Sequence, residues 1–399
     1  MPAWTRDRAM SSATRPIVAG IVTALVGFTS AFAVVLAGLT GVGATPGQAS
    51  SGLLAVSVTM GIASVVLAAW TRKPITVAWS TPGAALLAAT GPVEGGWPAA
   101  VGAFLVTGVL IILTGLIAPL GRLISAIPRS IAQAMLAGVL LPLCLGPVIG
   151  AVEDPWAVLP IIAVWLVALR FLPRWAVPLA FVAAFVVIVI HLGMTQNAID
   201  PAAFVPVVEL TMPAWSLGAV LGIALPLYLV TMASQNVAGV AVMRGLGYEV
   251  PWRASMVVTG IGTLVGAPAG GHAINLAAIS AALAAGPEAG EDRGRRWIAS
   301  VTSGVGVIVL GIASAAFVAI VLLAPVGVVA AVAGLALVAT LGSSISEAIQ
   351  VPAERIPAVA TFLVAASGIA VGGISAAFWA LVVGVVVRGA LIAFSRRRA

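Results

Sequence analysis

The chain consists of long apolar segments that are interrupted only by short polar connections. Hydrophobic residues make up 61% of its 399 residues and charged residues only 8%, whereas a soluble domain carries about 25% charged residues. A soluble enzyme, a secreted domain and a disordered chain are therefore excluded. The apolar runs are long and continuous rather than short and alternating, so they indicate membrane-spanning helices rather than a transmembrane barrel.

A spanning helix needs about 20 apolar residues, fewer if it is broken, and the sequence divides into fourteen such segments. The predicted spans are 16–38, 50–71, 74–90, 96–119, 128–149, 155–170, 175–193, 214–243, 253–267, 268–286, 297–323, 326–342, 356–371 and 374–394. We therefore predict an all-α polytopic membrane protein with one repeat of seven spans over 16–193 and a second over 214–394. An outer connection (194–213) joins the repeats, and short tails (1–15 and 395–399) flank them.

The charged residues predict the orientation of these spans. When the spans are threaded alternately with the N-terminus inside, all 19 basic residues fall on the cytoplasmic side, as the positive-inside rule requires. The outer connections then carry only acidic charges, for example Glu94 and Asp200. The net charge of +7 thus reflects orientation and not nucleic-acid binding. Because seven is odd, the second repeat enters the membrane from the opposite face, which is typical of inverted-repeat transporters, and both termini are predicted to be cytoplasmic.

Two spans at corresponding places in the repeats are broken. The third span begins with β-branched and aromatic residues between Pro74 and Pro82, which favour a short extended strand. Thr81 and Pro82 then fit the N-cap and the first position of a half-helix. In the tenth span a Pro- and Gly-rich start precedes a predicted half-helix of about 14 residues.

Such breaks predict a substrate site, because irregular backbone is tolerated at membrane depth only where protein or a cavity covers it. The alternative is a pair of kinks that serve packing alone. Each half-helix N-terminus offers N–H groups and the positive end of a dipole, which favour an anion. We expect a carboxylate to lie against 81–84 and 271–273.

A few polar residues lie inside the predicted spans, and His272 is the one titratable side chain expected near the midplane. For the amides among them the alternative is interhelical hydrogen bonding, and Trp79 could pack in the core or stack on a substrate ring. His272 is the candidate for proton coupling, with the substrate's own carboxyl group as the alternative carrier. No metal site or cofactor is expected, since Cys144 is the only cysteine. The candidate substrate-binding residues are Trp79, Ser80, Thr81, Pro82, Gly83, Gln235, Asn236, Gly271, His272 and Asn275.

Three stretches, 75–83 (ITVAWSTPG), 232–236 (MASQN) and 270–275 (GGHAIN), resemble the benzoate/proton symporter (BenE) family, and the resemblance extends over essentially the whole chain. It implies the fold shared with nucleobase and sulfate-permease-like transporters. In that fold spans 1–4 and 8–11 form a core domain, spans 5–7 and 12–14 form a gate domain, and spans 3 and 10 carry short strands and half-helices. Where nucleobase relatives have acidic residues in spans 8 and 10, this chain has Gln235 and His272, which suit a carboxylate substrate better.

The sequence thus predicts a secondary transporter of the inner membrane that imports benzoate or a related aromatic carboxylate with protons. A nucleobase/proton symporter and an anion channel of the same fold are the alternatives. An enzyme is not expected, because no HExxH, paired mid-membrane aspartates or nucleophile turn occurs. The expected partners are the aromatic acid, protons and membrane lipid; the oligomeric state stays open, with a homodimer as one option.

Overall fold

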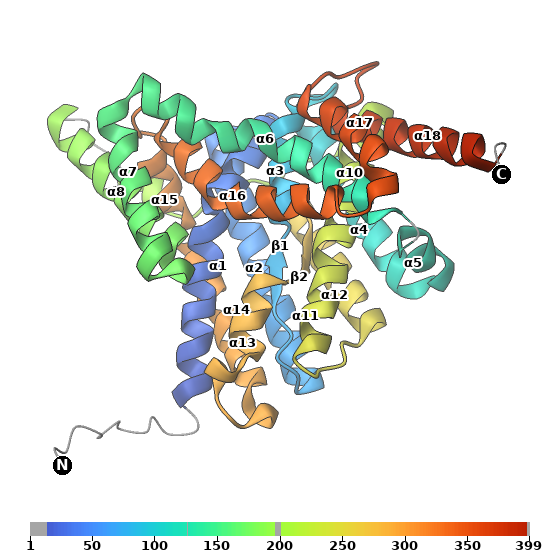
Figure 1. The fold of residues 1–399 in the computed structure, drawn as a ribbon. Helices are drawn as coiled ribbons and strands as arrows, with labels where there is room; N and C mark the ends of the chain where they lie inside the picture. The colour runs from blue at the N-terminus through green and yellow to red at the C-terminus, as the bar shows by residue number, and fades with distance from the viewer. Residues whose placement is uncertain (1–13, 126, 196–200, 397–399) are drawn as a thin grey trace, which may run out of the picture.

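The computed structural model describes residues 14–125, 127–195 and 201–396, and these are mostly helical (Figure 1). Within these ranges nine helices are long and apolar enough to cross a membrane, and α7 is a shorter apolar helix. The α-helices are α1 (Thr14–Gly41), α2 (Pro46–Thr71), α3 (Thr81–Thr90), α4 (Gly96–Leu116), α5 (Ala118–Ser125), α6 (Arg129–Glu153), α7 (Pro155–Phe171), α8 (Ala176–Thr195), α9 (Leu217–Ala219), α10 (Leu225–Val230), α11 (Val237–Gly245), α12 (Trp252–Gly266), α13 (Ile279–Ala285), α14 (Trp297–Ile312), α15 (Ser314–Val321), α16 (Val328–Ala348), α17 (Arg355–Ala366) and α18 (Ala376–Arg396).

Shorter elements join these helices. Two strands are present in the described ranges, β1 (Val77–Trp79) and β2 (Ile274–Leu276). The 3-10 turns are η1 (Pro173–Trp175), η2 (Pro201–Phe204), η5 (Ala267–Ala269), η6 (Pro287–Ala289), η7 (Arg293–Arg295) and η8 (Pro352–Glu354), and the π-helices are η3 (Val220–Ala224) and η4 (Thr231–Asn236). Each of the fourteen predicted spans coincides with a helix or with a group of elements that includes a helix. The number of crossings and the inverted repeat remain predictions.

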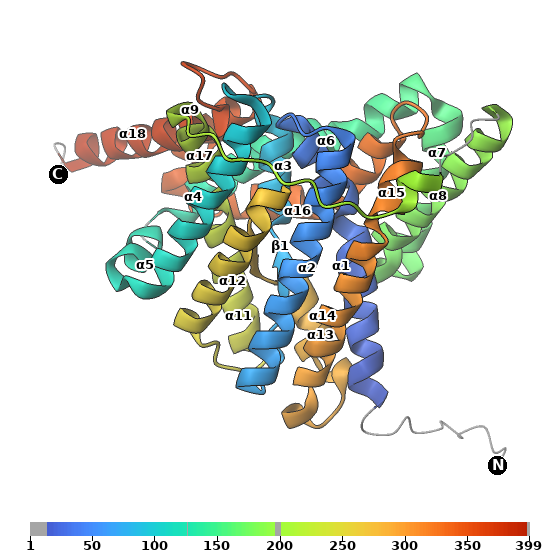
Figure 2. The ribbon, with the colours of Figure 1, turned by 180° about the vertical axis from the view of Figure 1, so that it is seen from behind.

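The two strands form an antiparallel pair in the middle of the fold, where they pack against α2 and α12 (Figures 1 and 2). Segments from the two halves of the sequence thus meet, as expected for two broken spans that converge. The opposed residues are Val77 and Leu276, Ala78 and Asn275, and Trp79 and Ile274.

A hydroxyl group from the preceding helix holds each strand. The backbone N–H of Val77 donates to Oγ of Ser64 in α2 at 2.8 Å. The N–H of Ile274 donates to Oγ1 of Thr263 in α12 at 3.1 Å. Both hydroxyl residues are buried, so each satisfies a backbone donor that would otherwise lose its partner away from water. The same device occurs at the same place in each half of the chain.

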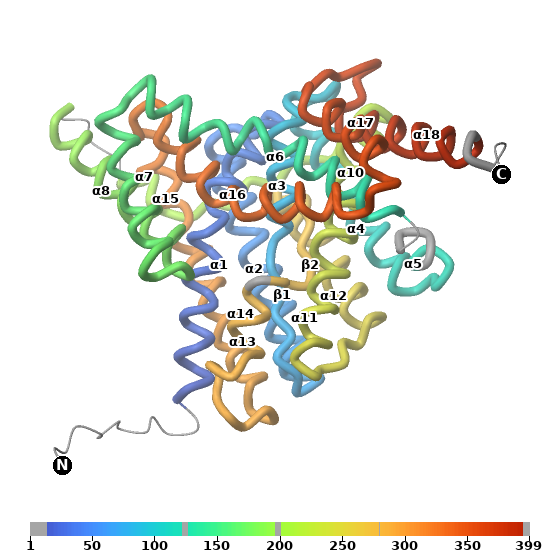
Figure 3. The backbone as a smooth tube through the Cα atoms, in the orientation of Figure 1, coloured from blue at the N-terminus to red at the C-terminus, as the bar shows by residue number. Residues whose placement is uncertain are grey.

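Small residues allow the helices to pack closely, as in other membrane bundles. A Cβ atom built on Gly61 of α2 would lie 2.5 Å from the carbonyl oxygen of Gly304 in α14, and one on Gly38 of α1 would lie 2.4 Å from that of Ala84 in α3. The backbones of α1 and α3, and those of α2 and α14, therefore meet at distances that larger side chains would prevent. Elsewhere, helices α6 and α16 run side by side in the upper part of the molecule (Figure 3).

The helical stretch from α9 to α11 is not a regular α-helix. Pro226 in α10 has no N–H to offer the carbonyl of Gly222, and its ring crowds that carbonyl. The backbone accordingly forms the π-helix η3 before Pro226, with the N–H of Leu225 bonded to the carbonyl of Val220. The Ser375 hydroxyl donates to the Gly222 oxygen at 2.6 Å instead. A second π-helix, η4, follows α10 and contains Gln235 and Asn236, two of the three amide residues among the predicted site residues.

The described part of the predicted outer connection, from η2 to α9, runs as an extended chain across the face seen in Figure 2. The N–H of Thr211 donates to the Pro268 carbonyl at 2.8 Å, and the N–H of Ala214 donates to the Pro98 carbonyl at 2.9 Å. The connection is therefore bound to the elements that flank both broken spans. Asp200, which the orientation argument used, lies outside the described residues.

Two predictions for the broken spans are wrong in detail. The N-cap of α3 is Ser80 and not Thr81. The half-helix predicted to begin near 271–273 begins only at Ile279 and has 7 residues, because the preceding residues extend to pair with β1. Strand pairing in the buried centre outweighs the helical propensity of the alanines in this segment.

Candidate substrate site

Beside the strand pair, one carbonyl group links the start of α3 to His272. The carbonyl oxygen of Ala273, just before β2, accepts a hydrogen bond from the backbone N–H of Ser80 at 2.9 Å. The same oxygen lies 3.1 Å from Nδ1 of His272. The start of α3 and the histidine ring therefore meet at one point, although they lie far apart in the sequence.

The N-terminus of α3 is built around the Ser80 side chain. Its Oγ accepts hydrogen bonds from the N–H of Gly83 at 3.2 Å and from the hydroxyl of Thr231 at 2.8 Å. Ser80 is fully buried, and the positive end of the α3 dipole lies at this point. A Cβ atom on Gly83 would lie 2.4 Å from Cδ1 of Leu227 and 2.7 Å from Ser80 Oγ. A side chain at position 83 would therefore displace Leu227 or the Ser80 cap.

His272 is buried, with 1% of its surface exposed. A carbonyl oxygen can only accept a hydrogen bond, so the contact with Ala273 assigns a proton to Nδ1. Nε2 has no hydrogen-bond partner among the described residues. In the neutral ring Nε2 carries a lone pair, and after protonation it becomes a donor. The ring can thus present either an acceptor or a cationic donor to a group that comes close to Nε2.

The two asparagines differ in how they are bonded. Asn236 Oδ1 accepts the N–H of Leu276 at 2.9 Å, which ties η4 to β2. Asn275 donates from Nδ2 to the Leu276 carbonyl at 2.8 Å, but its buried Oδ1 has no partner in the described part of the chain. Gln235 is half-buried on η4. Asn236 therefore has a structural bond, although it is made to a strand and not to another helix as the alternative expected, whereas Asn275 keeps an unsatisfied oxygen.

Trp79 is only 3% exposed and packs against Phe28 of α1 with 5.4 Å between the ring centroids. Phe28 in turn contacts Phe32 and Phe317. This arrangement corresponds to the packing role that was one of the two alternatives for Trp79. The ring nevertheless belongs to the last residue of β1, directly before Ser80.

Gly271 does not stand at a half-helix N-terminus, contrary to the prediction. A Cβ atom at this position would lie 3.1 Å from the carbonyl oxygen of Gly266 and 3.2 Å from the N atom of Val56 in α2. Gly271 therefore allows the extended segment to pass close to α2. Thr81 and Pro82 form the first turn of α3, as the sequence indicated to within one residue.

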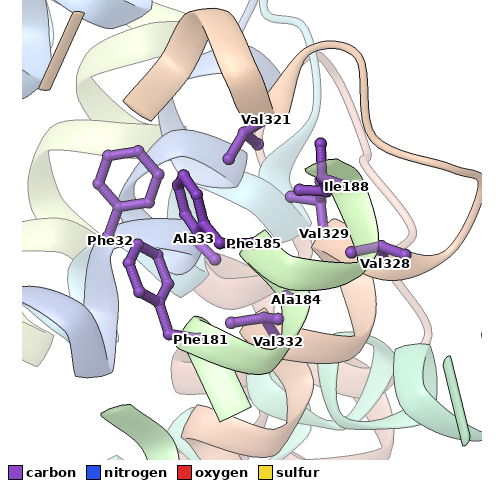
Figure 4. Close-up of a pocket in the computed structure, with 10 residues that line it drawn as sticks. All are labelled: Phe32, Ala33, Phe181, Ala184, Phe185, Ile188, Val321, Val328, Val329 and Val332. Carbon is purple, nitrogen blue, oxygen red and sulfur yellow. The ribbon is translucent and has the colours of Figure 1, made fainter. Parts of the chain in front are cut away.

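The predicted residues do not line either of two pockets in the structure. One is an apolar crevice between α1, α8, α15 and α16, where the rings of Phe32, Phe181 and Phe185 gather (Figure 4). The other, of about 250 Å³, lies under the predicted outer connection and includes Glu209. By contrast, eight of the ten candidate residues are buried within the protein, and the two exceptions are Thr81 and Gln235.

Sequence reasoning missed the hydroxyl groups that hold the candidate residues. Thr231 bonds Ser80, and Ser64 and Thr263 bond the two strands. Each is a hydroxyl residue in an otherwise apolar segment, which could have been a signal. Such residues are common in membrane helices, where many bond their own helix backbone, so the sequence does not distinguish these three.

Comparison with known proteins identifies the family. The family model described as "Benzoate membrane transport protein" (BenE) matches residues 10–390. The inner membrane protein YdcO of Escherichia coli (strain K12) is 37% identical over 370 residues, which cover 92% of this chain and 93% of YdcO. The benzoate membrane transport protein of Acinetobacter baylyi is 32% identical over 335 residues, which cover 84% of each chain.

Solved structures share the fold. The transmembrane domain of the cyanobacterial bicarbonate transporter BicA superposes with a TM-score of 0.62 at 16% identity, covering 94% of this chain and 98% of that domain. SLC26A9 superposes with a TM-score of 0.60 at 13% identity, covering 95% of this chain and 66% of SLC26A9. The resemblance seen in the sequence is confirmed: this chain is a membrane transporter that belongs to the benzoate membrane transport (BenE) family.

Proposed function

We propose that the protein imports benzoate or a related aromatic carboxylate together with protons across the inner membrane, by alternating access. The observation that carries this proposal is the family match over residues 10–390, together with a relative of 32% identity that is named as a benzoate transporter. The buried junction between β1, α3 and the segment before β2 supports the choice of site. A nucleobase carrier is less well supported, because no acidic side chain lies among the candidate residues.

The carboxylate binds at the N-terminus of α3 in this proposal. The positive end of the helix dipole favours a negative charge there, and the Ser80 hydroxyl can donate a hydrogen bond. Trp79 lies at the end of β1, next to this position, and offers an apolar surface to the aromatic ring. Because Ser80 is buried in this structure, the site opens to one side of the membrane only after the surrounding elements move.

The proton travels on His272 in this proposal. Each 100 mV of membrane potential opposes the entry of one negative charge by about 2.3 kcal/mol, and a proton that accompanies the anion removes this penalty. Neutral His272 would direct the Nε2 lone pair at a carboxylate, whereas protonated His272 donates a hydrogen bond to it. Protonation and anion binding therefore favour each other by linkage. The buried Nε2, which has no partner in the described chain, supports this role.

The wider architecture belongs to the proposal as well. We assign residues 16–193 and 214–394 to two inverted repeats, whose spans 1–4 and 8–11 form a core and whose other spans form a gate. The antiparallel pairing of β1 with β2 and the matched hydroxyl bonds from Ser64 and Thr263 support this assignment. With both termini cytoplasmic, a cysteine placed at Glu94 in a Cys144-free background should react with an impermeant thiol reagent from outside, and one at Arg293 should not.

Uptake into proteoliposomes tests the function. The purified protein is reconstituted, and the uptake of radiolabelled benzoate, substituted benzoates and uracil is measured with and without an imposed inward proton gradient. We expect benzoate to accumulate in a manner that depends on the gradient, and we expect uracil not to compete with it. Uptake of uracil in place of benzoate would contradict the assignment, and a flux far above carrier turnover would indicate a channel.

A further inference from the structure

The π-helix η4 holds both broken segments at once. At its first residue, the Thr231 hydroxyl donates to Oγ of Ser80, which caps α3. At its last residue, Asn236 Oδ1 accepts the N–H of Leu276 in β2. Thr231, Ser80 and Asn236 are fully buried. The π-helix η4 is thus hydrogen-bonded to both broken segments, one from each half of the chain.

The π geometry makes this double contact feasible. In an α-helix, residues five positions apart point about 140° away from each other. In a π-helix the N–H of residue i+5 bonds the carbonyl of residue i, which brings such residues closer to one face. The N–H of Val237 bonds the carbonyl of Met232 in this way. A regular α-helix would turn either Thr231 or Asn236 away from the paired strands.

The bond from Thr231 also determines what the Ser80 hydroxyl can do. A serine hydroxyl has two acceptor positions and one proton to donate. Thr231 and the Gly83 N–H occupy both acceptor positions of Ser80 Oγ. The Ser80 proton is then left to donate to a third group. A carboxylate only accepts hydrogen bonds, so this arrangement suits a carboxylate better than a neutral amide, which also brings donors.

We propose that Thr231 is a positioning residue that makes Ser80 a dedicated hydrogen-bond donor for the substrate carboxylate. This inference rests on the proposed function, because it takes the carboxylate to bind at the start of α3. It adds a residue outside the sequence motifs of the site and gives a reason for the π-helix. Thr231 itself acts through Ser80 and does not contact the substrate.

The test compares Thr231→Val, which keeps the shape but removes the hydroxyl, with Thr231→Ser, which keeps the hydroxyl. KM and kcat for benzoate uptake are measured in proteoliposomes, along with Tm of the purified variants. We expect Thr231→Val to raise KM about tenfold with little change in kcat, and Thr231→Ser to restore most of the affinity. The matched control is Thr259→Val, since Thr259 is equally buried and its hydroxyl bonds carbonyls of its own helix.

A double-mutant cycle with Ser80→Ala completes the test. If Thr231 acts through Ser80, Thr231→Val adds nothing further to KM in the Ser80→Ala background. Additive effects, or a lower Tm with an unchanged KM, would overturn the inference. If Thr231→Val does not fold, Thr231→Ala is measured in the same cycle. Failure of the wild-type protein to take up benzoate would instead overturn the proposed function, and this inference with it.

Discussion

The two broken segments are held at opposite ends. Helix α3 has 10 residues, and the Ser80 side chain caps its N-terminus. Helix α13 has 7 residues, and no side chain of the described chain caps its N-terminus at Ala278. Its C-terminus is held instead by the buried Arg296, which donates from Nη1 to the Ala285 carbonyl at 2.8 Å and from Nε to the Gly290 carbonyl at 2.7 Å.

This difference indicates a division of roles within the proposed site. The first half of the chain supplies a capped helix N-terminus, which favours an anion. The second half supplies an extended segment with His272 and Asn275, both of which carry a buried atom without a partner in the described structure. The two segments thus correspond in place but offer different chemistry, and the following variants test that difference.

The largest effect on substrate binding is expected from Gly83→Val. The new side chain would collide with Leu227 and with the Ser80 cap, so benzoate binding should weaken by about 10- to 100-fold, in line with an overpacking cost of about 1–3 kcal/mol. Gly271→Val should act differently, by pushing the extended segment away from α2. Binding is measured by calorimetry on purified protein. Gly27→Val is the control, because a Cβ at Gly27 meets no described atom within 4 Å; wild-type affinity in Gly83→Val would rule out the α3 site.

The next variant removes the support of α13. Arg296→Gln loses two hydrogen bonds from a charged donor, which should lower the free energy of unfolding by about 2–4 kcal/mol. Arg296→Lys should retain only part of this stability, because lysine lacks the planar fork of donors that arginine has. Thermal unfolding in detergent measures both, with the exposed Arg244→Gln as the control. Equal melting of Arg296→Gln and Arg244→Gln would mean that the C-terminal support is unimportant.

Exchanging the caps gives a smaller effect. Ser80→Ala should destabilise the protein by about 1 kcal/mol, as loss of an N-cap usually does. The reverse change, Ala278→Ser, should give no gain, because Ala278 has φ and ψ angles of −102° and −62° rather than the extended ones of a capping residue. Both are read from Tm. A rise in Tm for Ala278→Ser would show that the two N-termini are equivalent after all.

The smallest effect concerns Glu354, which lies outside the predicted spans and far from both segments in the sequence. The Ser130 hydroxyl, which donates to Oε2 at 2.5 Å, and Arg388, with Nε 2.9 Å from Oε1, hold the pKa of Glu354 below its usual value. The ionised form of Glu354 is thus favoured in the folded state. Its contribution to the stability of the fold is present above the unfolded pKa of about 4.3 and is lost as the pH falls through the folded pKa. Glu354→Gln should flatten the dependence of Tm on pH below about 4.5 and leave benzoate affinity unchanged. A changed affinity would show that Glu354, Ser130 and Arg388 influence the substrate site.

The sequence predicted the membrane class, the positions of the helical segments and the two breaks, because these depend on apolar length and on Pro and Gly. The family was predicted from the three motifs that resemble BenE. The sequence analysis placed the cap of α3 one residue too late and the start of α13 several residues too early. Both errors involve tertiary contacts: the Thr231 hydroxyl bonds Ser80 from far along the chain, and strand pairing extends the segment before α13. Local propensity carries no information about such partners.

The candidate residues were likewise only partly interpretable from the sequence. His272 and Asn275 could be named because polar groups are rare inside apolar segments. The bonding of Asn236 to β2 and the packing of Trp79 on Phe28 depend on residues far away in the chain. The π-helix η4 could not be predicted, since it is one turn within a continuous apolar helix.

The most direct test of proton coupling is benzoate affinity as a function of pH in the wild-type protein and in His272→Gln. We predict that wild-type affinity falls by up to about tenfold for each pH unit above the titration of His272, as expected when one proton binds with the anion. In His272→Gln this dependence near neutral pH should disappear. If His272→Gln keeps the wild-type pH dependence and still accumulates benzoate on a proton gradient, the proton travels on the substrate and the role assigned to His272 is wrong.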